Sequence, residues 1–250
     1  GGSGFASANR NAPWPEYFAA AQALILESPP PSTDDTVFRR TAALGVRREG
    51  GFDARRFSRA QARAIAAGLA RALEQAKNAG QSGEQRGAWI YPRANLGAFG
   101  QDYAYRAQIA LNGLAALPLE EATYLRPLGP DGGELDSTRT WRLRFPPGGL
   151  PPVNAFWSLS AYEVTPDGQA YLFENPIGRY AIGDRTPGLD YGPDGSLEIW
   201  IAPRDPGPSR RRNWLPAPPS GRPMQLNLRA YLPRPELSGG AYAPPPLTLA

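Results

Sequence analysis

Apolar residues in the first part of the chain recur at intervals of three and four, the spacing of an amphipathic helix. The pattern predicts four helices, over residues 14–27, 32–44, 58–78 and 102–117. Ser58 and Gln61 have the spacing of a capping box at the start of the third helix, and Gly45 is the expected end of the second. We therefore predict a flexible N-terminus over residues 1–12 and a helical region over residues 13–118.

Beyond this region the hydrophobic period changes to two, which is typical of strands with one buried face. Alternating runs occur at residues 140–145, 157–164, 170–173, 196–202 and 224–232. Pro-Asp-Gly sequences at residues 166–168 and 193–195 are typical of turns between strands. The pattern predicts an antiparallel β-sandwich of jelly-roll type over residues 119–250, so the expected fold class is α+β, with helices before strands.

The composition removes several classes of chemistry. The 250 residues include 29 prolines and 28 glycines but no cysteine and no histidine. Without cysteine the chain has no disulfide and no thiol nucleophile, and without histidine it has neither a Ser-His-Asp triad nor an imidazole ligand for a transition metal. We therefore expect no metal and no cofactor. Any acid–base step has to use Asp, Glu, Tyr or the single lysine, Lys77.

Arginine supplies almost all of the positive charge behind the net charge of +4, and the arginines are dispersed along the chain. The one tight run, residues 210–212, lies in a proline-rich segment and is expected to be a solvated loop, so we predict no nucleic-acid partner. No apolar stretch approaches the ~20 residues of a membrane span. The chain opens on Gly-Gly-Ser-Gly without Met, which resembles either an added linker or a processed end from which a signal peptide has been removed.

Five polar and aromatic residues gather in one short segment that proline and glycines bend. They are Asn175, Arg179, Tyr180, Asp184 and Arg185. On a structural interpretation, Asp184 pairs with an arginine and Asn175 ties a turn together through its side chain. On a functional interpretation, the two arginines bind a carboxylate, a sulfate or sugar hydroxyls, and Tyr180 supplies a flat apolar face. All five are candidate ligand-binding residues.

Other candidates lie outside this segment. Trp157 and Trp200 fall on alternating runs and are expected in the core. Trp214 lies in a predicted loop, where it either closes a ligand pocket or covers the end of the sandwich. At the start of the fourth predicted helix, Asp102, Tyr103 and Arg106 share one face. Either Asp102 and Arg106 form an ordinary helical ion pair, or Tyr103 or Arg106 lends its side chain to the same pocket.

Several stretches resemble a bacterial protein family: EYF at residues 16–18, DYAYRA at 102–107, LPPVNAFW at 150–157, the run 175–188, and NWLP at 213–216. In these stretches the chain is similar to domain of unknown function 1214, which is usually found at the C-terminal end of proteins that also carry domain of unknown function 1254. The resemblance implies a jelly-roll domain after a helical segment in an exported protein, and hence a periplasmic or secreted location. It implies no settled activity, and it makes this chain either a C-terminal piece or a shorter relative.

Three hypotheses for function remain open. The first is an exported, non-catalytic binding or interaction module for a saccharide, an acidic ligand or another protein. The second is a histidine-independent hydrolase or lyase, with Asp184 or Glu174 as base and Arg179 or Arg185 stabilising negative charge. The third is a structural subunit of a larger assembly that docks through its tail, residues 239–246. A deep cavity with paired carboxylates favours the enzyme, a shallow aromatic groove favours binding, and a flat apolar face favours assembly.

Overall fold

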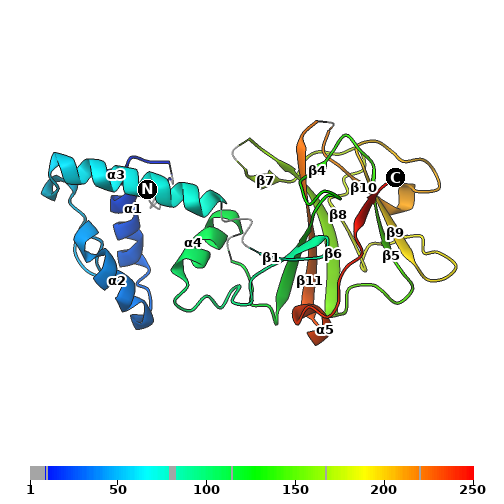
Figure 1. Ribbon diagram of the computed structural model, residues 1–250, viewed down its shortest axis with the longest axis horizontal. Coiled ribbons are helices and arrows are strands. Elements are labelled where there is room, and N and C mark those ends of the chain that lie inside the picture. Colours follow the sequence, from blue (N-terminus) through cyan, green and yellow to red (C-terminus); the bar gives the residue numbers. More distant parts are fainter. Residues whose placement is uncertain (1–8, 10, 79–82, 114, 167, 220) are drawn as a thin grey trace, which may run out of the picture. The chain divides into compact units, whose positions relative to one another are not determined.

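The computed structural model describes residues 9, 11–78, 83–113, 115–166, 168–219 and 221–250 (Figure 1). The chain divides into two compact units, Gly1–Ala79 and Gly80–Ala250. In the described part of the chain the first unit is helical, and we call it the helical unit. The second, which we call the β-domain, holds two β-sheets.

The helical unit consists of α1 (Trp14–Glu27), α2 (Asp35–Thr41) and α3 (Arg59–Asn78), with a short 3-10 turn on each side of α2. The predicted capping box is confirmed. The backbone N–H of Ser58 donates to Oε1 of Gln61 at 2.9 Å, and the N–H of Gln61 donates to Oγ of Ser58 at 3.3 Å. Gly45 ends the second predicted helix with a φ of +80°, a conformation that residues with a Cβ disfavour.

Little apolar surface is fully buried in the helical unit. Val46 is the one buried hydrophobic residue among its described residues. Gln22 of α1 is buried, and its side-chain amide exchanges two hydrogen bonds of 2.8 Å with the backbone N–H and carbonyl of Arg47. The aromatic side chains form a half-buried cluster of edge-on and tilted rings, which consists of Trp14, Phe18, Phe52 and Phe57. The helical unit is therefore held by polar contacts and ring packing more than by a closed core.

The larger sheet of the β-domain has eight strands among the described residues. They are β1 (Glu84–Arg86), β2 (Trp89–Tyr91), β3 (Ala122–Pro127), β4 (Leu135–Asp136), β6 (Val153–Val164), β7 (Ala170–Tyr171), β8 (Ala181–Gly183) and β11 (Pro223–Pro233). The strand order is β1-β2-β3-β11-β6-β7, with β4 beside β11 and β8 beside β6. The two longest strands, β6 and β11, are antiparallel neighbours and form the centre of the sheet (Figure 1).

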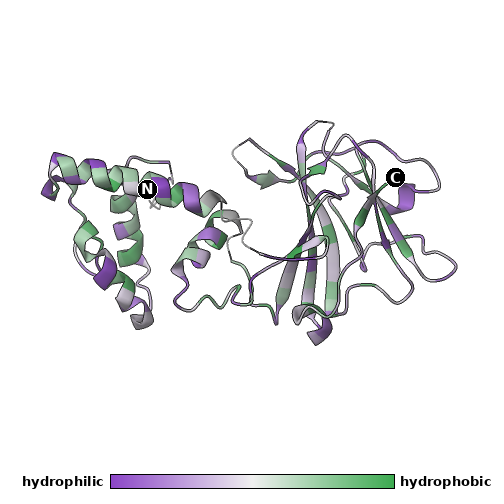
Figure 2. Cartoon of the chain, in the orientation of Figure 1, coloured by the Kyte–Doolittle hydropathy of each residue, from purple (hydrophilic) through white to green (hydrophobic). Residues whose placement is uncertain are grey.

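The smaller sheet contains β5 (Trp141–Phe145), β9 (Leu197–Ala202), β10 (Trp214–Pro216) and β12 (Leu247–Leu249), in the order β10-β9-β5-β12. Alternation decides its faces: along β5, Trp141, Leu143 and Phe145 are buried while the two intervening arginines point outward. The bands of alternating hydropathy along the strands are visible in Figure 2. Both sheets contribute to one core, where the rings of Phe145 and Trp157 lie 5.4 Å apart. Two layers of strands with a shared core make the β-domain the stable scaffold of the chain.

The architecture is α+β, as predicted, while the jelly-roll order of the strands stays a prediction. Burial of Trp157 and Trp200, which are 2% and 9% exposed, is confirmed, and so is the exposure of residues 210–212. The hairpin β1–β2 lies where the sequence favours helices, because strands of three residues are too short to show a period. This hairpin and α4 (Tyr103–Asn112) belong to the β-domain, so the chain divides at residues 79/80 and not at residue 118.

The C-terminal tail packs against its own domain. Nε1 of Trp89 donates to the carbonyl of Pro245 and the hydroxyl of Tyr91 donates to the carbonyl of Tyr242, both at 2.9 Å. The hydroxyl of Tyr242 in turn donates to the carbonyl of Gly149 at 2.9 Å, and β12 then pairs with β5. The prediction of a docking arm over residues 239–246 is therefore wrong, because the aromatic side chain of this segment serves inside the domain.

Candidate functional site

Residues 175–188 form a corner of the β-domain that is fastened by side chains to the backbone. Oδ1 of Asn175 accepts a hydrogen bond from the backbone N–H of Arg179 at 2.9 Å, which closes a turn. Nη1 of Arg179 donates to the carbonyls of Arg212 and Trp214, each at 2.8 Å, and burial lowers the pKa of this arginine. The guanidinium thus ties the corner to the start of β10, with its Nη1 engaged by carbonyls of the chain itself.

Asp184 also has a structural contact. Its Oδ1 accepts a hydrogen bond from the backbone N–H of Trp157 at 3.2 Å, next to the last pair that joins β8 to β6. In the described part of the chain Asp184 forms no ion pair, so the predicted contact with an arginine is wrong. The strand pairing ends beside this point, and the backbone N–H of Trp157 takes the carboxylate as its acceptor.

Trp214, on β10, is buried inside the β-domain. It is 2% exposed, and its Nε1 donates to the carbonyl of Ala202 at 2.9 Å. Of the two interpretations left open by the sequence, this placement favours the structural one. Tyr180 lies at the surface with 39% of its area exposed.

The two candidates on α4 have local contacts. Cζ of Arg106 lies 5.0 Å from the ring centroid of Tyr103, its neighbour on the helix. The N-cap of α4 is Asp102, whose Oδ1 accepts from the backbone N–H of Tyr105 at 3.1 Å and whose Oδ2 pairs with Arg93 at 2.6 Å. These contacts fix α4 to the segment that precedes it.

The outer face of the larger sheet brings together aromatic and arginine side chains from neighbouring strands. The register of β6 and β11 places Phe156 opposite Tyr231 and Ser158 opposite Arg229. Tyr124 of β3 lies opposite Arg229 on the other side of β11. We define the outer sheet face by its half-buried or exposed residues Tyr124, Arg126, Phe156, Ser158, Tyr162, Arg185, Arg229 and Tyr231.

Side chains of the outer sheet face are packed against one another. The rings of Phe156 and Tyr231 are stacked, with centroids 4.4 Å apart and an interplanar angle of 21°. Arg185, from the loop after β8, lies over Phe156 with Cζ 4.1 Å from the ring centroid. Nη2 of Arg229 donates to the hydroxyl of Tyr162 at 2.6 Å. These contacts hold two guanidinium groups in place beside aromatic rings.

The charges on the outer sheet face are of one sign. Among the described residues, no carboxylate forms an ion pair with Arg126, Arg185 or Arg229. Elsewhere in the β-domain arginines do pair with carboxylates, as in Arg86–Glu84, Arg144–Glu198, Arg211–Asp205, Arg212–Asp190 and Arg222–Glu163. Burial lowers the pKa of Arg126, and the more distant charge of Glu134 opposes this shift. The outer sheet face is therefore a preformed cationic and aromatic surface.

Most of this surface lies outside the candidates named from the sequence, of which only Arg185 belongs to it. The signal was present in the outward positions of β6 and β11, which include two aromatic residues on β6 and an arginine and a tyrosine on β11: Phe156, Tyr162, Arg229 and Tyr231. What the sequence lacked was the pairing of these strands, which are about seventy residues apart in the chain. Without that pairing, nothing in the sequence indicated that the outward-facing residues of β6 and β11 lie on one surface.

No helix in the described part of the chain is long and apolar enough to cross a membrane. The same residues contain no cluster of three or more carboxylates suited to holding a metal ion.

Residues 120–235, from just before β3 to just after β11, match the model of a family described as "Protein of unknown function (DUF1214)". Over these residues the chain is similar to that family, which confirms the resemblance found in the sequence. The outer sheet face lies wholly within the DUF1214 region. A neighbouring domain of unknown function 1254 stays a prediction. No curated protein matches the chain.

Two solved structures are similar to this chain. The VPA0106 protein from Vibrio parahaemolyticus is 20% identical over 96% of this chain and 56% of its own, with a TM-score of 0.61. An uncharacterized protein from Burkholderia cenocepacia is 14% identical over 93% of this chain and 48% of its own, with a TM-score of 0.36. The similarity to the Vibrio protein shows a shared fold. This chain spans about half the length of both proteins.

Proposed function

We propose that the β-domain is a non-catalytic binding module and that its outer sheet face binds an anionic saccharide. The observation that carries the proposal is the set of three arginines without a carboxylate partner among the described residues, placed beside stacked aromatic rings. A guanidinium stays charged at any physiological pH. Partial burial of such a charge, as at Arg126 and Arg229, is unfavourable until an anion accepts its hydrogen bonds, so this face favours an anionic ligand.

The shape and chemistry of the face favour a saccharide over a small anion. Arg185 follows β8 and Arg126 lies on β3, so the arginines extend over four neighbouring strands. At ~4.8 Å per strand spacing, this width is about 14 Å, which exceeds the size of a single carboxylate or sulfate. The hydroxyls of Ser158 and Tyr162 are suited to sugar hydroxyls, and the tyrosine rings supply flat apolar surface. A short oligomer of uronic acid combines these features with a carboxylate on every ring.

Catalysis is less well supported by the same geometry. Glu174 and Asp184, the carboxylates considered as bases, are both exposed, and Asp184 already accepts a backbone N–H. A general base has to lie within hydrogen-bond reach of a bound substrate, in a site that excludes water. The binding module is therefore the better proposal.

The test is isothermal titration calorimetry of the full chain with a trimer of galacturonic acid and with a neutral trimer of galactose. We expect binding of the acidic trimer only. Arg126→Gln and Arg229→Gln should each weaken it roughly tenfold, since a hydrogen bond to a charged group contributes at least ~1.5 kcal/mol. The matched control is Arg204→Gln, which removes an exposed arginine of the same domain and should leave affinity unchanged.

Equal affinity for both trimers, no binding of the acidic trimer, or full affinity in both arginine variants would each refute the proposed site. Cleavage of the acidic trimer during the titration, seen by mass spectrometry, would establish the hydrolase or lyase hypothesis instead.

We propose in addition that the module works outside the cytoplasm and has the jelly-roll strand order. The support for both is the DUF1214 resemblance, together with two sheets on one core. Fractionation of cells that produce the protein from its own gene tests the location: recovery in the cytoplasmic fraction alone would contradict export.

A further inference from the structure

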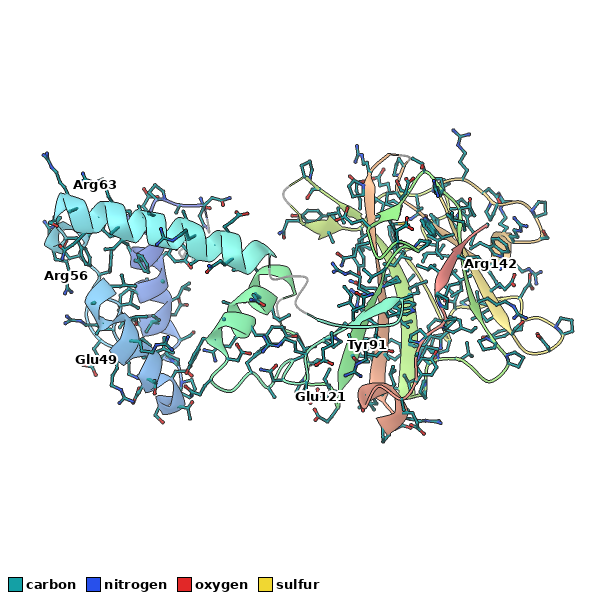
Figure 3. All side chains as sticks on the ribbon, viewed as in Figure 1. Glu49, Arg56, Arg63, Tyr91, Glu121 and Arg142 are labelled. Atoms are coloured by element: carbon teal, nitrogen blue, oxygen red, sulfur yellow. The ribbon has the colours of Figure 1, made fainter. Side chains whose placement is uncertain are left out.

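Positive charge is concentrated in the helical unit. Residues 80–250 carry sixteen arginines and sixteen carboxylates, so the β-domain region is balanced. By contrast, residues 39–71 contain nine arginines and two carboxylates. All of these arginines except Arg48 are exposed, and Arg63 extends from α3 away from the neighbouring helices in Figure 3. Carboxylates before and after this stretch reduce the excess, so residues 1–79 as a whole carry ten arginines, one lysine and seven carboxylates, a net charge of +4, which is the whole net charge of the chain.

Apolar surface accompanies this charge. Leu24 and Leu26, near the end of α1, are 36% and 45% exposed, and green hydrophobic residues run along α1 in Figure 2. No described side chain of α3 is buried, although Ile65, Leu69 and Leu73 share one apolar stripe. The aromatic cluster around Trp14 is only half-buried. The helical unit thus combines a cationic polar surface with apolar side chains that its own fold does not cover.

We propose that the helical unit binds an anionic lipid surface. Arginines spread over two helices and the segments between them match a diffuse layer of negative headgroups. A partly inserted amphipathic unit buries its leucines and aromatic rings at the headgroup boundary while its arginines remain beside the lipid charges. Duplex nucleic acid or an acidic protein would satisfy the charge and leave Leu24, Leu26 and the ring cluster uncovered, so a bilayer is the better fit.

The experiment is co-sedimentation of the full chain with vesicles of phosphatidylcholine alone and with vesicles containing one quarter phosphatidylglycerol. We expect binding to the anionic vesicles only, and its loss at high salt. Arg59→Gln combined with Arg63→Gln should lower the partition constant roughly thirtyfold, at about fivefold per arginine. The control pair, Arg204→Gln with Arg234→Gln, removes the same charge from the β-domain and should leave partitioning unchanged.

Tryptophan fluorescence separates a bilayer from a soluble polyanion. Trp14 is the one tryptophan of six that is not buried, so insertion should shift the emission of the chain to shorter wavelength. The shift should be absent in Trp14→Phe, and absent when duplex DNA or polyglutamate is added in place of vesicles. Sedimentation with neutral and anionic vesicles alike, or with neither, would overturn the proposal. So would equal loss in both arginine pairs, or binding to DNA or polyglutamate without binding to vesicles.

Discussion

Arg179 is the residue whose role the structure changes most, and its replacement gives the sharpest test. The sequence offered it as a ligand-binding group, whereas the structure engages it with backbone carbonyls across the corner. Nη1 makes two hydrogen bonds of 2.8 Å, to Arg212 and Trp214, and a longer one of 3.4 Å to Arg211. A hydrogen bond to a charged group is worth roughly 1.5–3 kcal/mol, and the half-exposed position reduces this to about 1–1.5 kcal/mol for each short bond.

Arg179→Ala should therefore lower the free energy of unfolding of the β-domain by about 2–3 kcal/mol. For a domain of this size, such a loss corresponds to a melting temperature about 5–10 °C lower. Arg179→Lys keeps the charge but loses the planar fork of donors, so its melting temperature should lie between those of the wild type and Arg179→Ala. The assay is thermal unfolding followed by circular dichroism, with Arg204→Ala as the control that should match the wild type.

An unchanged melting temperature in Arg179→Ala would refute the structural role of this guanidinium. If the same variant also failed to bind the acidic trimer, the original assignment of Arg179 to a ligand site would be restored. A lower melting temperature with unchanged affinity for the trimer would support a structural role for the corner and a ligand-binding role for the outer sheet face.

Three further substitutions test other parts of the β-domain. Trp214→Phe removes one of the two hydrogen bonds to the carbonyl of Ala202, which keeps the backbone N–H of Ala217 as a donor, and should cost about 1 kcal/mol in denaturant unfolding; wild-type stability would contradict the packing described. Gly183→Ala places a Cβ 2.1 Å from the carbonyl oxygen of Trp157, so we expect severe destabilisation or insoluble protein, and a soluble variant of normal stability would be the contrary result. The pKa of Asp102 is lowered by hydrogen bonds from the first turn of α4 and nearby polar groups, so its contribution is present above the unfolded-state pKa of ~3.9 and is lost as pH falls through the lower folded-state value. Asp102→Asn should lose stability near neutral pH and show a flatter decline in acid, and parallel pH profiles of variant and wild type would disprove the linkage.

The local parts of the fold were predictable because their signals are local. The capping box of Ser58 and Gln61 depends on residues three positions apart, and the end of the second helix depends on the single glycine Gly45. Long alternating runs likewise predicted β5, β6, β9 and β11, since a strand with one buried face has a period of two. Short strands such as β8 and β10 show no period, and only their partners define them.

The candidate site depends on contacts between segments that are distant in the sequence, and hydrophobic periodicity cannot reveal such contacts. Arg179, Asp184 and Trp214 have the residue types of a ligand site, yet their partners are backbone groups of other segments. The sequence by itself determined which residues are able to form helices and strands, which side of each long strand is apolar, and which chemistries lack their residues. Only the tertiary structure decided which arginines find a partner, because pairing depends on which strands and loops lie side by side. It took the register of β6 and β11 to bring Phe156 against Tyr231 and to leave Arg229 beside them without a carboxylate.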